Sequence, residues 1–173
     1  MNMQIIPPPF PSENKERFVD AMAALANGVS IVTTQGPSGK VGLTVSAVTS
    51  VSAEPPTLLA CLNRKSLAAA AIDKNRRFAV NILNAQSQDM AQVFSGRVAA
   101  GKSYDFSRQE WTEGNRLGMP ILKDATASFE CELENFTDVG THRIFIGRVI
   151  SALRGEVEPM VYSNRSYGRM VRT

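Results

Sequence analysis

The chain has 173 residues, of which 43% are apolar and 20% are charged, which is typical of one globular domain with a sizeable core and excludes two full-sized domains. Nineteen basic against 16 acidic residues give a net charge of +3. The only dense basic cluster is Lys74, Arg76 and Arg77, so the charge favours a solvated surface over a nucleic-acid-binding face.

Cysteine and histidine are scarce, which excludes several kinds of site. Cys61 and Cys131 form no CxxC motif, so a zinc ribbon and a thioredoxin-type redox pair are excluded. Each lies in an apolar run, which predicts buried free thiols in a reducing compartment. The single histidine, His142, excludes a His-rich metal site, and we expect no metal. No GxSxG motif, the nucleophile elbow of serine hydrolases, accompanies this histidine in the sequence.

The N-terminal segment has neither a basic n-region nor a long apolar stretch, and no apolar run approaches the roughly 18 to 20 residues of a membrane span. We therefore expect a cytoplasmic protein that binds no membrane. Residues 1–13 are Pro-rich and predict an extended arm, followed by a single domain over residues 14–173. Residues 14–26 predict a helix that Gly28 ends, because apolar residues recur there at i, i+4 and i+7: Phe18, Met22 and Leu25.

The next part of the chain is rich in Val, Ile and Thr and predicts β-structure. Residues 29–34 read as a strand, and residues 36–39 as a turn. Residues 41–52 predict a long strand or a strand pair, which a Glu-Pro-Pro sequence at 54–56 interrupts. A third strand is expected over residues 57–62.

Helical and β-like segments then follow one another. Residues 66–75 predict a short helix, with Ser66 as N-cap and a run of alanines that favour the helix. A fourth strand is expected over residues 77–83 and another short helix over residues 87–94. Residues 95–120 show no sustained period and predict a long loop.

Residues 127–136 alternate as a half-buried strand does. One face is expected to carry Ala127, Phe129, Cys131 and Leu133, and the other Ser128, Glu130, Glu132 and Glu134. Further strands are expected over residues 142–153 and 159–162. The total is six or seven strands with two or three short helices and no regular crossover helices, which favours a mainly β, antiparallel barrel.

Residues 96–103 match the phosphate-binding pattern GxxxxGK[ST]. That site requires a buried strand before the loop and a helix that starts at the Lys-Ser pair. Here the preceding residues look helical, and the following ones have no helical apolar face. A nucleotide hydrolase is therefore a disfavoured alternative, although Arg97 and Lys102 remain cations that suit a phosphate. No GxGxxG is present, so a Rossmann site is excluded.

Small hydroxyl residues gather on the second β-segment: Thr44, Ser46, Thr49, Ser50 and Ser52. The stretch Asn63-Arg64-Lys65-Ser66 follows at the mouth of a predicted helix, and a helix N-terminus beside cations is a favourable anion site. The alternative is structural, because hydroxyl residues are common in strands and Ser66 needs only to cap its helix.

An ordered set of segments resembles the short-chain flavin reductases over about residues 16–167. Typical stretches are Gly42-Leu-Thr-Val-Ser46, Cys61-Leu-Asn63-Arg64-Lys65-Ser66 and Gly140-Thr-His142-Arg-Ile-Phe-Ile-Gly147. The other matching segments are residues 21–34, 47–56, 77–83, 90–96 and 159–162. The sequence is most similar to the reductase components of two-component aromatic monooxygenases of the phenol or hydroxyphenylacetate type.

The resemblance implies a split β-barrel of the Greek-key type with a few short helices, assembled as a homodimer. It implies NAD(P)H-dependent reduction of free or loosely bound FAD or FMN. The reduced flavin would pass to a separate oxygenase in aromatic-compound catabolism. Hydride passes directly between the two cofactors, so the protein supplies proximity and orientation and needs no catalytic side chain. A non-catalytic flavin- or haem-binding split-barrel protein is the alternative.

The resemblance also assigns residues to the cofactors. Those implied to bind flavin are Thr44, Val45, Ser46, Thr49, Ser50, Cys61, Leu62, Asn63, Arg64, Ser66, Phe94, Ser95 and Lys102, with Asn63 to Ser66 at the phosphate. His142 and Tyr167 are implied to lie on the nicotinamide side. Ala47 and Val48 depart from the family's usual residues. The alternative for His142 is a purely structural role, in which its side chain only forms hydrogen bonds to a loop.

Overall fold

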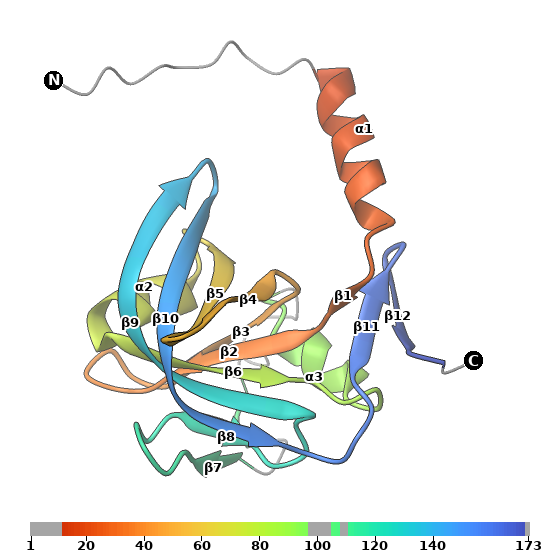
Figure 1. Cartoon of the computed structure of the whole chain (residues 1–173). Helices are drawn as coiled ribbons and strands as arrows, with labels where there is room; N and C mark the ends of the chain where they lie inside the picture. The colour runs from red at the N-terminus through yellow and green to blue at the C-terminus, as the bar shows by residue number, and fades with distance from the viewer. Residues whose placement is uncertain (1–11, 97–104, 108–110, 172–173) are drawn as a thin grey trace, which may run out of the picture.

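Antiparallel pairing dominates the computed structural model, which describes residues 12–96, 105–107 and 111–171 (Figure 1). The main sheet has seven strands, all antiparallel to their neighbours. Their order is β3 (Val41–Val45), β2 (Ser30–Thr34), β6 (Arg77–Ile82), β9 (Ala127–Val139), β10 (His142–Arg154), β5 (Pro56–Asn63) and β4 (Val48–Ala53). The predicted mainly β, antiparallel fold is confirmed.

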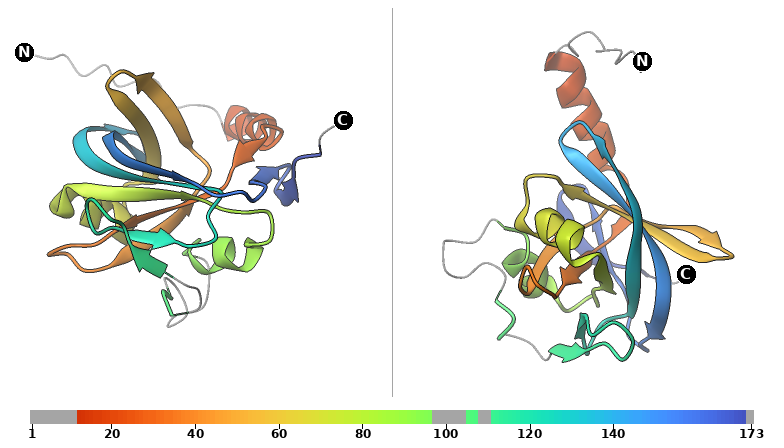
Figure 2. Two further views of the ribbon diagram at one scale, coloured as in Figure 1. Left: turned by 60° about the horizontal axis from the view of Figure 1, so that its bottom comes forward. Right: turned by 90° about the vertical axis from the view of Figure 1, so that its left-hand side faces the viewer.

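The sheet curls into a barrel that is split between β3 and β4 (Figure 2). These two strands follow one another in the chain, with only Ser46 and Ala47 between them, yet they form the two opposite edges of the sheet. The predicted segment 41–52 is therefore a strand pair. The fold is the expected split β-barrel, with its opening next to the hydroxyl-rich residues.

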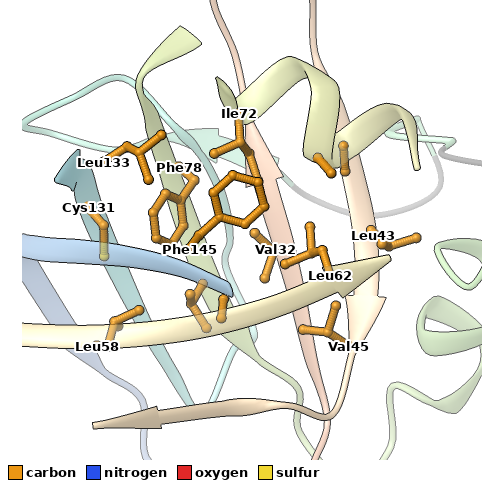
Figure 3. Packing of buried hydrophobic residues seen from close by; sticks show 14 residues of the cluster. Val32, Leu43, Val45, Leu58, Leu62, Ile72, Phe78, Cys131, Leu133 and Phe145 are labelled. Carbon is orange, nitrogen blue, oxygen red and sulfur yellow. The ribbon is translucent and has the colours of Figure 1, made fainter. Parts of the chain in front are cut away.

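Aliphatic side chains packed around two phenylalanines fill the barrel (Figure 3). The ring centroids of Phe78 and Phe145 lie 6.5 Å apart, and Ile72 of helix α2 (Leu67–Asn75) packs over them. Gly147 is required by this packing, because a Cβ there would lie 2.5 Å from the Phe78 ring. The predicted N-cap of α2 is confirmed, since the Ser66 hydroxyl accepts a hydrogen bond from the backbone N–H of Ala69 at 3.1 Å.

A second apolar cluster joins the barrel to a small sheet. It surrounds α3 (Gln88–Val93), the second predicted short helix, with Met90 and Phe94 fully buried. The small sheet has the order β1 (Asn27–Gly28), β11 (Met160–Ser163), β12 (Ser166–Arg169). β12 is absent from the sequence-based assignment, because Ser-Tyr-Gly-Arg has no alternating apolar pattern. Backbone bonds anchor this sheet to the barrel, from the N–H of Met160 to the Leu83 carbonyl and from the N–H of Leu83 to the Val29 carbonyl, both at 2.8 Å.

Helix α1 (Ser12–Ala23) projects from the barrel (Figure 1). It begins at Ser12, so residues 12 and 13 of the expected extended arm are helical, and it ends three residues before the predicted end at residue 26. The rest of that arm, residues 1–11, lies outside the described residues. Phe18, Met22 and Leu25, whose spacing predicted the helix, are exposed. None of the described helices is long and apolar enough to cross a membrane.

Part of the predicted loop 95–120 is a two-stranded ribbon, so that prediction is wrong there. β7 (Trp111–Glu113) pairs with β8 (Pro120–Leu122). Strands of three residues are too short to show a period. A second correction concerns Ser128 and Glu130, which were placed on the polar face of β9 but are buried. The Ser128 hydroxyl donates to the side-chain oxygen of Asn81 at 2.9 Å, and the turn between β7 and β8 covers Glu130.

Glu130 is a buried carboxylate that organises the residues between β7 and β8. Its Oε1 accepts from the backbone N–H groups of Leu117 at 2.8 Å and Met119 at 3.3 Å, and its Oε2 from that of Arg116 at 3.1 Å. A Cβ at Gly114 would lie 2.2 Å from the same carboxylate. The tight approach of backbone to carboxylate therefore depends on a glycine at this position.

The two cysteines are free, as predicted, but they differ in burial. Cys131 is fully buried, and this burial together with the negative charge of Glu130 raises the pKa of its thiol to about 12. Cys61 is only half-buried, which corrects the sequence expectation, because the β4–β5 pair lies at the split edge of the barrel. Burial raises the pKa of Cys61 as well.

Replacing Glu130 by Ala is expected to lower the free energy of unfolding by about 2–3 kcal/mol, because three backbone N–H groups, one buried and two partly buried, lose their acceptor. Chemical denaturation measures this. The matched control is Glu132→Ala on the same strand. Glu132 pairs with Arg148 at the surface, where both side chains are nearly half exposed, so the control should cost less than about 1 kcal/mol. Equal effects of the two variants would contradict the structural role of Glu130.

Candidate functional site

A cavity of about 210 Å³ opens at the split of the barrel. It lies where β3 ends and the small sheet meets the segment after α3. Its lining residues are Val29, Thr44, Val45, Ser46, Ser95, Tyr162 and Tyr167. Five of these, from β3, the α3 end and β12, are among the residues that the sequence assigned to the cofactors. The structure thus brings together five sequence-assigned residues that lie up to 123 positions apart in the chain, from Thr44 to Tyr167.

Thr44 is fixed by two hydrogen bonds to the α3 segment. Its backbone N–H donates to the Phe94 carbonyl at 2.9 Å, and its hydroxyl donates to the Ala91 carbonyl at 2.8 Å. The hydroxyl proton is therefore engaged within the protein. Ser46, two residues on, is exposed at the corner where β3 leaves the sheet. A ligand in the cavity would meet the backbone of this corner as well as its hydroxyl groups.

Two tyrosines form another wall of the cavity. Tyr162 and Tyr167 are directly opposite each other in the β11–β12 hairpin, and their ring centroids lie 5.0 Å apart. The sequence analysis assigned Tyr167 but not Tyr162 or Val29. Asn164 and Arg165, which join the strands, both have positive φ, as the compact two-residue hairpin turn requires. Recognising that turn would have placed Tyr162 opposite Tyr167.

Phe94 is a buried neighbour of the cavity-lining residues Thr44 and Ser95. Its ring is fully buried, and its centroid lies 5.0 Å from that of Phe106 and 5.5 Å from that of Trp111. Its other side faces Gly42, where a Cβ would lie 2.8 Å from the ring. Phe94 was assigned to the flavin, and the structure places its side chain in this aromatic cluster, with its carbonyl holding Thr44.

The corner beside the cavity is hydrogen-bonded to β5, the strand that ends at the turn before a helix N-terminus; we call the corner, the end of β5 and the turn 63–66 the track. The carbonyl of Ala47, at the corner, accepts from the backbone N–H of Cys61 at 2.9 Å. Two residues beyond Cys61, the turn 63–66 begins. The bond therefore connects the corner to the strand that leads into the turn. Within the track Leu62 is buried in the barrel core, whereas Thr49 and Ser50 on β4 are exposed.

The turn 63–66 has the form of an anion site. The Asn63 side-chain oxygen accepts from the backbone N–H of Lys65 at 2.9 Å, and Ser66 caps α2. Arg64 and Lys65 are both exposed. Since α2 has its N-terminus here, the partial positive charge of the helix end adds to that of the two side chains.

His142 lies beside this turn, at the tip of the β9–β10 hairpin. It is opposite Asn63 in the β5–β10 register, and the backbone N–H of Arg64 donates to the Thr141 carbonyl at 3.1 Å. The His142 ring contacts the Thr141 hydroxyl at 2.9 Å and is exposed. The sequence assigned His142 and Tyr167 to the same nicotinamide side, but within one chain they belong to different sheets.

Arg143 holds the hairpin against α2. Its Nε and Nη2 donate to the two carboxylate oxygens of Asp138 at 2.6 and 3.0 Å, and its Nη1 donates to Asp73 of α2 at 3.3 Å. Its guanidinium also lies 4.1 Å from the centroid of the Phe136 ring. The hydrogen bond from Arg143 lowers the pKa of Asp138. The position of His142 relative to the turn 63–66 is thereby fixed.

The arrangement suits binding and orientation. The residues that line the cavity include no His, Cys, Asp or Glu, and no group of three such residues suited to a metal occurs among the described parts of the chain. Lys102, assigned to the flavin, lies outside the described residues. The cavity between the corner and the tyrosines offers hydroxyl, backbone and aromatic groups, and the turn offers two cationic side chains.

Comparison with known proteins identifies the same architecture elsewhere. The family model for the flavin reductase-like domain matches residues 22–170. An FMN reductase (NADH), RutF, from Stutzerimonas stutzeri is 40% identical over 154 residues, which are 88% of this chain and 87% of the relative.

Two solved structures show the likeness in three dimensions. A putative flavin reductase from Haemophilus somnus superposes with a TM-score of 0.83 at 38% identity, covering 90% of this chain and 98% of that one. BorF, the flavin reductase component of a bacterial two-component tryptophan halogenase, superposes with a TM-score of 0.83 at 29% identity, covering 92% and 99%.

The contact between Gly42 and Phe94 predicts that Gly42→Ala lowers the free energy of unfolding by about 1–3 kcal/mol, because the buried ring must shift. Fluorescence of Trp111, which contacts Phe94, reports the displacement. Gly28→Ala is the matched control, since a Cβ at Gly28 meets nothing within 4 Å. If Gly42→Ala were as stable as the control, with unchanged emission, the tight contact would be refuted.

Proposed function

The chain belongs to the family of flavin reductase-like domains and is a flavin oxidoreductase, and from this premise we propose that it uses NADH to reduce FMN. FAD is the second candidate flavin and NADPH the second candidate nucleotide. The observation that carries the proposal is the track from the cavity to the turn 63–66, in a chain 40% identical to an FMN reductase (NADH).

The residues present fit a flavin. The cavity between the corner at Ser46 and the two tyrosines has planar walls and backbone groups for a ring system. The turn at its other end offers Arg64, Lys65 and a helix N-terminus to a phosphate. When bound, the flavin supplies the hydride acceptor of the reaction. Thr44, Val45 and Ser46 would hold the ring, with Thr49 and Ser50 beside it on β4.

The chain's own contribution is orientation. Thr44 is tied to α3 and Ala47 to Cys61, so the corner is held rigidly and presents a fixed surface to the ring. We assign Tyr167 to the nicotinamide side of the cavity, where it and Tyr162 would limit the access of water. His142, beside the turn, is assigned to the dinucleotide, whose pyrophosphate or nicotinamide half it would position.

The proposal extends to partners. The reduced flavin would pass to a separate oxygenase; in support, BorF is named as the flavin reductase component of a two-component halogenase. Oxidation of an aromatic compound by that oxygenase, expected from the sequence, stays a prediction, as does a cytoplasmic location. The homodimer implied by the family is also part of the proposal, because α1 leaves an apolar face uncovered.

The experiment that tests the function is steady-state turnover. The purified protein is mixed with NADH or NADPH and with FMN or FAD, and the absorbance of the reduced nicotinamide is followed. Oxidation that needs added flavin is the expected result. A protein that binds flavin without turnover under all four conditions would be the non-catalytic split-barrel alternative, whereas magnesium-dependent nucleotide hydrolysis would favour the phosphate-loop alternative at residues 96–103.

Arg64→Ala is expected to raise the KM for flavin about five- to 150-fold, because a charge-assisted bond of about 1–3 kcal/mol to the phosphate is lost. The kcat should change little, since the phosphate lies away from the reacting ring. Arg154→Ala is the control, an exposed cation at the far end of β10. An equal fall in kcat and kcat/KM would instead mean that Arg64 stabilises the transition state of the hydride transfer.

His142→Ala is expected to lower kcat/KM for NADH about ten- to a hundredfold, or about 1.4–2.7 kcal/mol. Flavin affinity and stability should be retained, because His142 is exposed and its ring contacts only the neighbouring Thr141 among the bonds described. Normal NADH kinetics together with weaker flavin binding or a less stable fold would show that the histidine has only a structural role.

A further inference from the structure

The turn 63–66 has a carboxylate as a neighbour. Asp138 lies on β9 near the hairpin tip, directly opposite Arg143 on β10, and the same tip accepts a hydrogen bond from the backbone N–H of Arg64 through the Thr141 carbonyl at 3.1 Å. The hydrogen bond from Arg143 has the largest effect in lowering the pKa of Asp138, and the positive charge of Arg64 lowers it further. Asp138 therefore lies within electrostatic reach of Arg64.

A carboxylate at this place opposes the binding of a phosphate. Its negative charge repels an incoming phosphate and attracts the guanidinium that is meant to bind it. Arg64 is exposed, and a long exposed side chain adopts many conformations and pairs with the anion within its reach. Unless the carboxylate is otherwise engaged, Asp138 competes with the flavin phosphate for Arg64.

Arg143 engages both oxygens of this carboxylate, through Nε at 2.6 Å and Nη2 at 3.0 Å. Two parallel N–H groups fix the geometry of such a pair, which makes it the strongest arrangement of an arginine with a carboxylate. The guanidinium is itself held in place, because Nη1 donates to Asp73 and the Phe136 ring lies against it. Only 19% of the Arg143 side chain is exposed, so water screens this pair less than it screens an ordinary surface ion pair.

The ion pairs around the turn are consistent with this division of charges. Within the described part of the chain, no carboxylate forms an ion pair with Arg64. Asp73 has a second cationic partner, Arg76 at 3.7 Å. Asp138, in contrast, is paired with Arg143 alone among the described residues. Loss of Arg143 would therefore leave Asp73 paired and would release Asp138.

We infer that Arg143 keeps Asp138 engaged and thereby leaves Arg64 available to the flavin phosphate. Arg143 is then a positioning residue for flavin binding, which acts through Asp138 and Arg64. The inference rests on the proposed function, because it requires the phosphate to bind at the turn 63–66. The competing account is that the pair of Arg143 and Asp138 only stabilises the β9–β10 hairpin.

The two accounts differ in the sign of one effect. Arg143→Gln releases Asp138, so the Kd for FMN should rise about three- to tenfold, less than the loss of Arg64 itself would cause. Asp138→Asn removes the competing charge, so FMN should bind at least as tightly as to the wild-type chain. The variant that combines both substitutions should return to within about twofold of the wild-type Kd, because the two changes act on one interaction.

Calorimetric titration of the full chain with FMN measures these constants and requires no turnover. Riboflavin, which has the same ring system without the phosphate, is the second probe. All variants should bind riboflavin as the wild-type chain does, which also shows that they are folded. The matched control is Arg148→Gln, the same substitution on the same strand, because Arg148 pairs with Glu132 and Glu134 of β9. Its Kd for FMN should be unchanged.

Weaker FMN binding by both single variants, without rescue in the combined variant, would overturn the inference in favour of a purely structural ion pair. Weaker binding of riboflavin by Arg143→Gln would do the same, as would an unchanged Kd for FMN in that variant. A wild-type chain that binds FMN no more tightly than riboflavin would refute the phosphate site itself, and the inference with it. The comparison of the two probes on the wild-type chain thus separates a failure of the proposed site from a failure of the role of Arg143.

Discussion

The site depends on one feature of the backbone, the parting of β3 and β4 at Ser46 and Ala47. Two strands that are adjacent in the chain become the opposite edges of one sheet, so the barrel has an opening where they separate. Bonds from Thr44 to Phe94 and from Cys61 to Ala47 satisfy backbone groups that the ladder no longer pairs. These bonds hold the opening in place, so that its hydroxyl and backbone groups line the cavity.

β5 connects the two ends of the site. It carries Cys61, which is bonded to the corner, and ends at Asn63, where the turn before α2 begins. The corner beside the cavity, proposed to bind the ring, and the turn, proposed to bind the phosphate, are therefore connected by a few residues of one strand. Arg143, held between Asp138 and Asp73, fixes the hairpin that carries His142 beside the same turn. This spacing explains how a chain with a single histidine serves a reaction that its cofactors carry out.

Local sequence patterns predicted much of this arrangement. The hydroxyl-rich strand pair, the Ser66 cap and the aliphatic strands have strong short-range signals, and the ordered motifs pointed to Thr44, Ser46 and Tyr167. Burial of Glu130 could not be predicted, because the backbone groups that it accepts from lie 11 to 14 residues away and have no side-chain pattern. Tyr162 was missed because only the hairpin register places it in the cavity. The periodic face of α1 was recognised, but its spacing does not say which molecule covers it.

The central claim is that flavin occupies the track from the barrel split to the turn 63–66. Hydrogen exchange of the full chain with and without FMN, resolved to peptides by mass spectrometry, tests this directly. The account predicts slower exchange in peptides that cover residues 44–50 and 61–67, and unchanged exchange in the ribbon at residues 111–122. Protection confined to other segments, or none at saturating FMN, would contradict it.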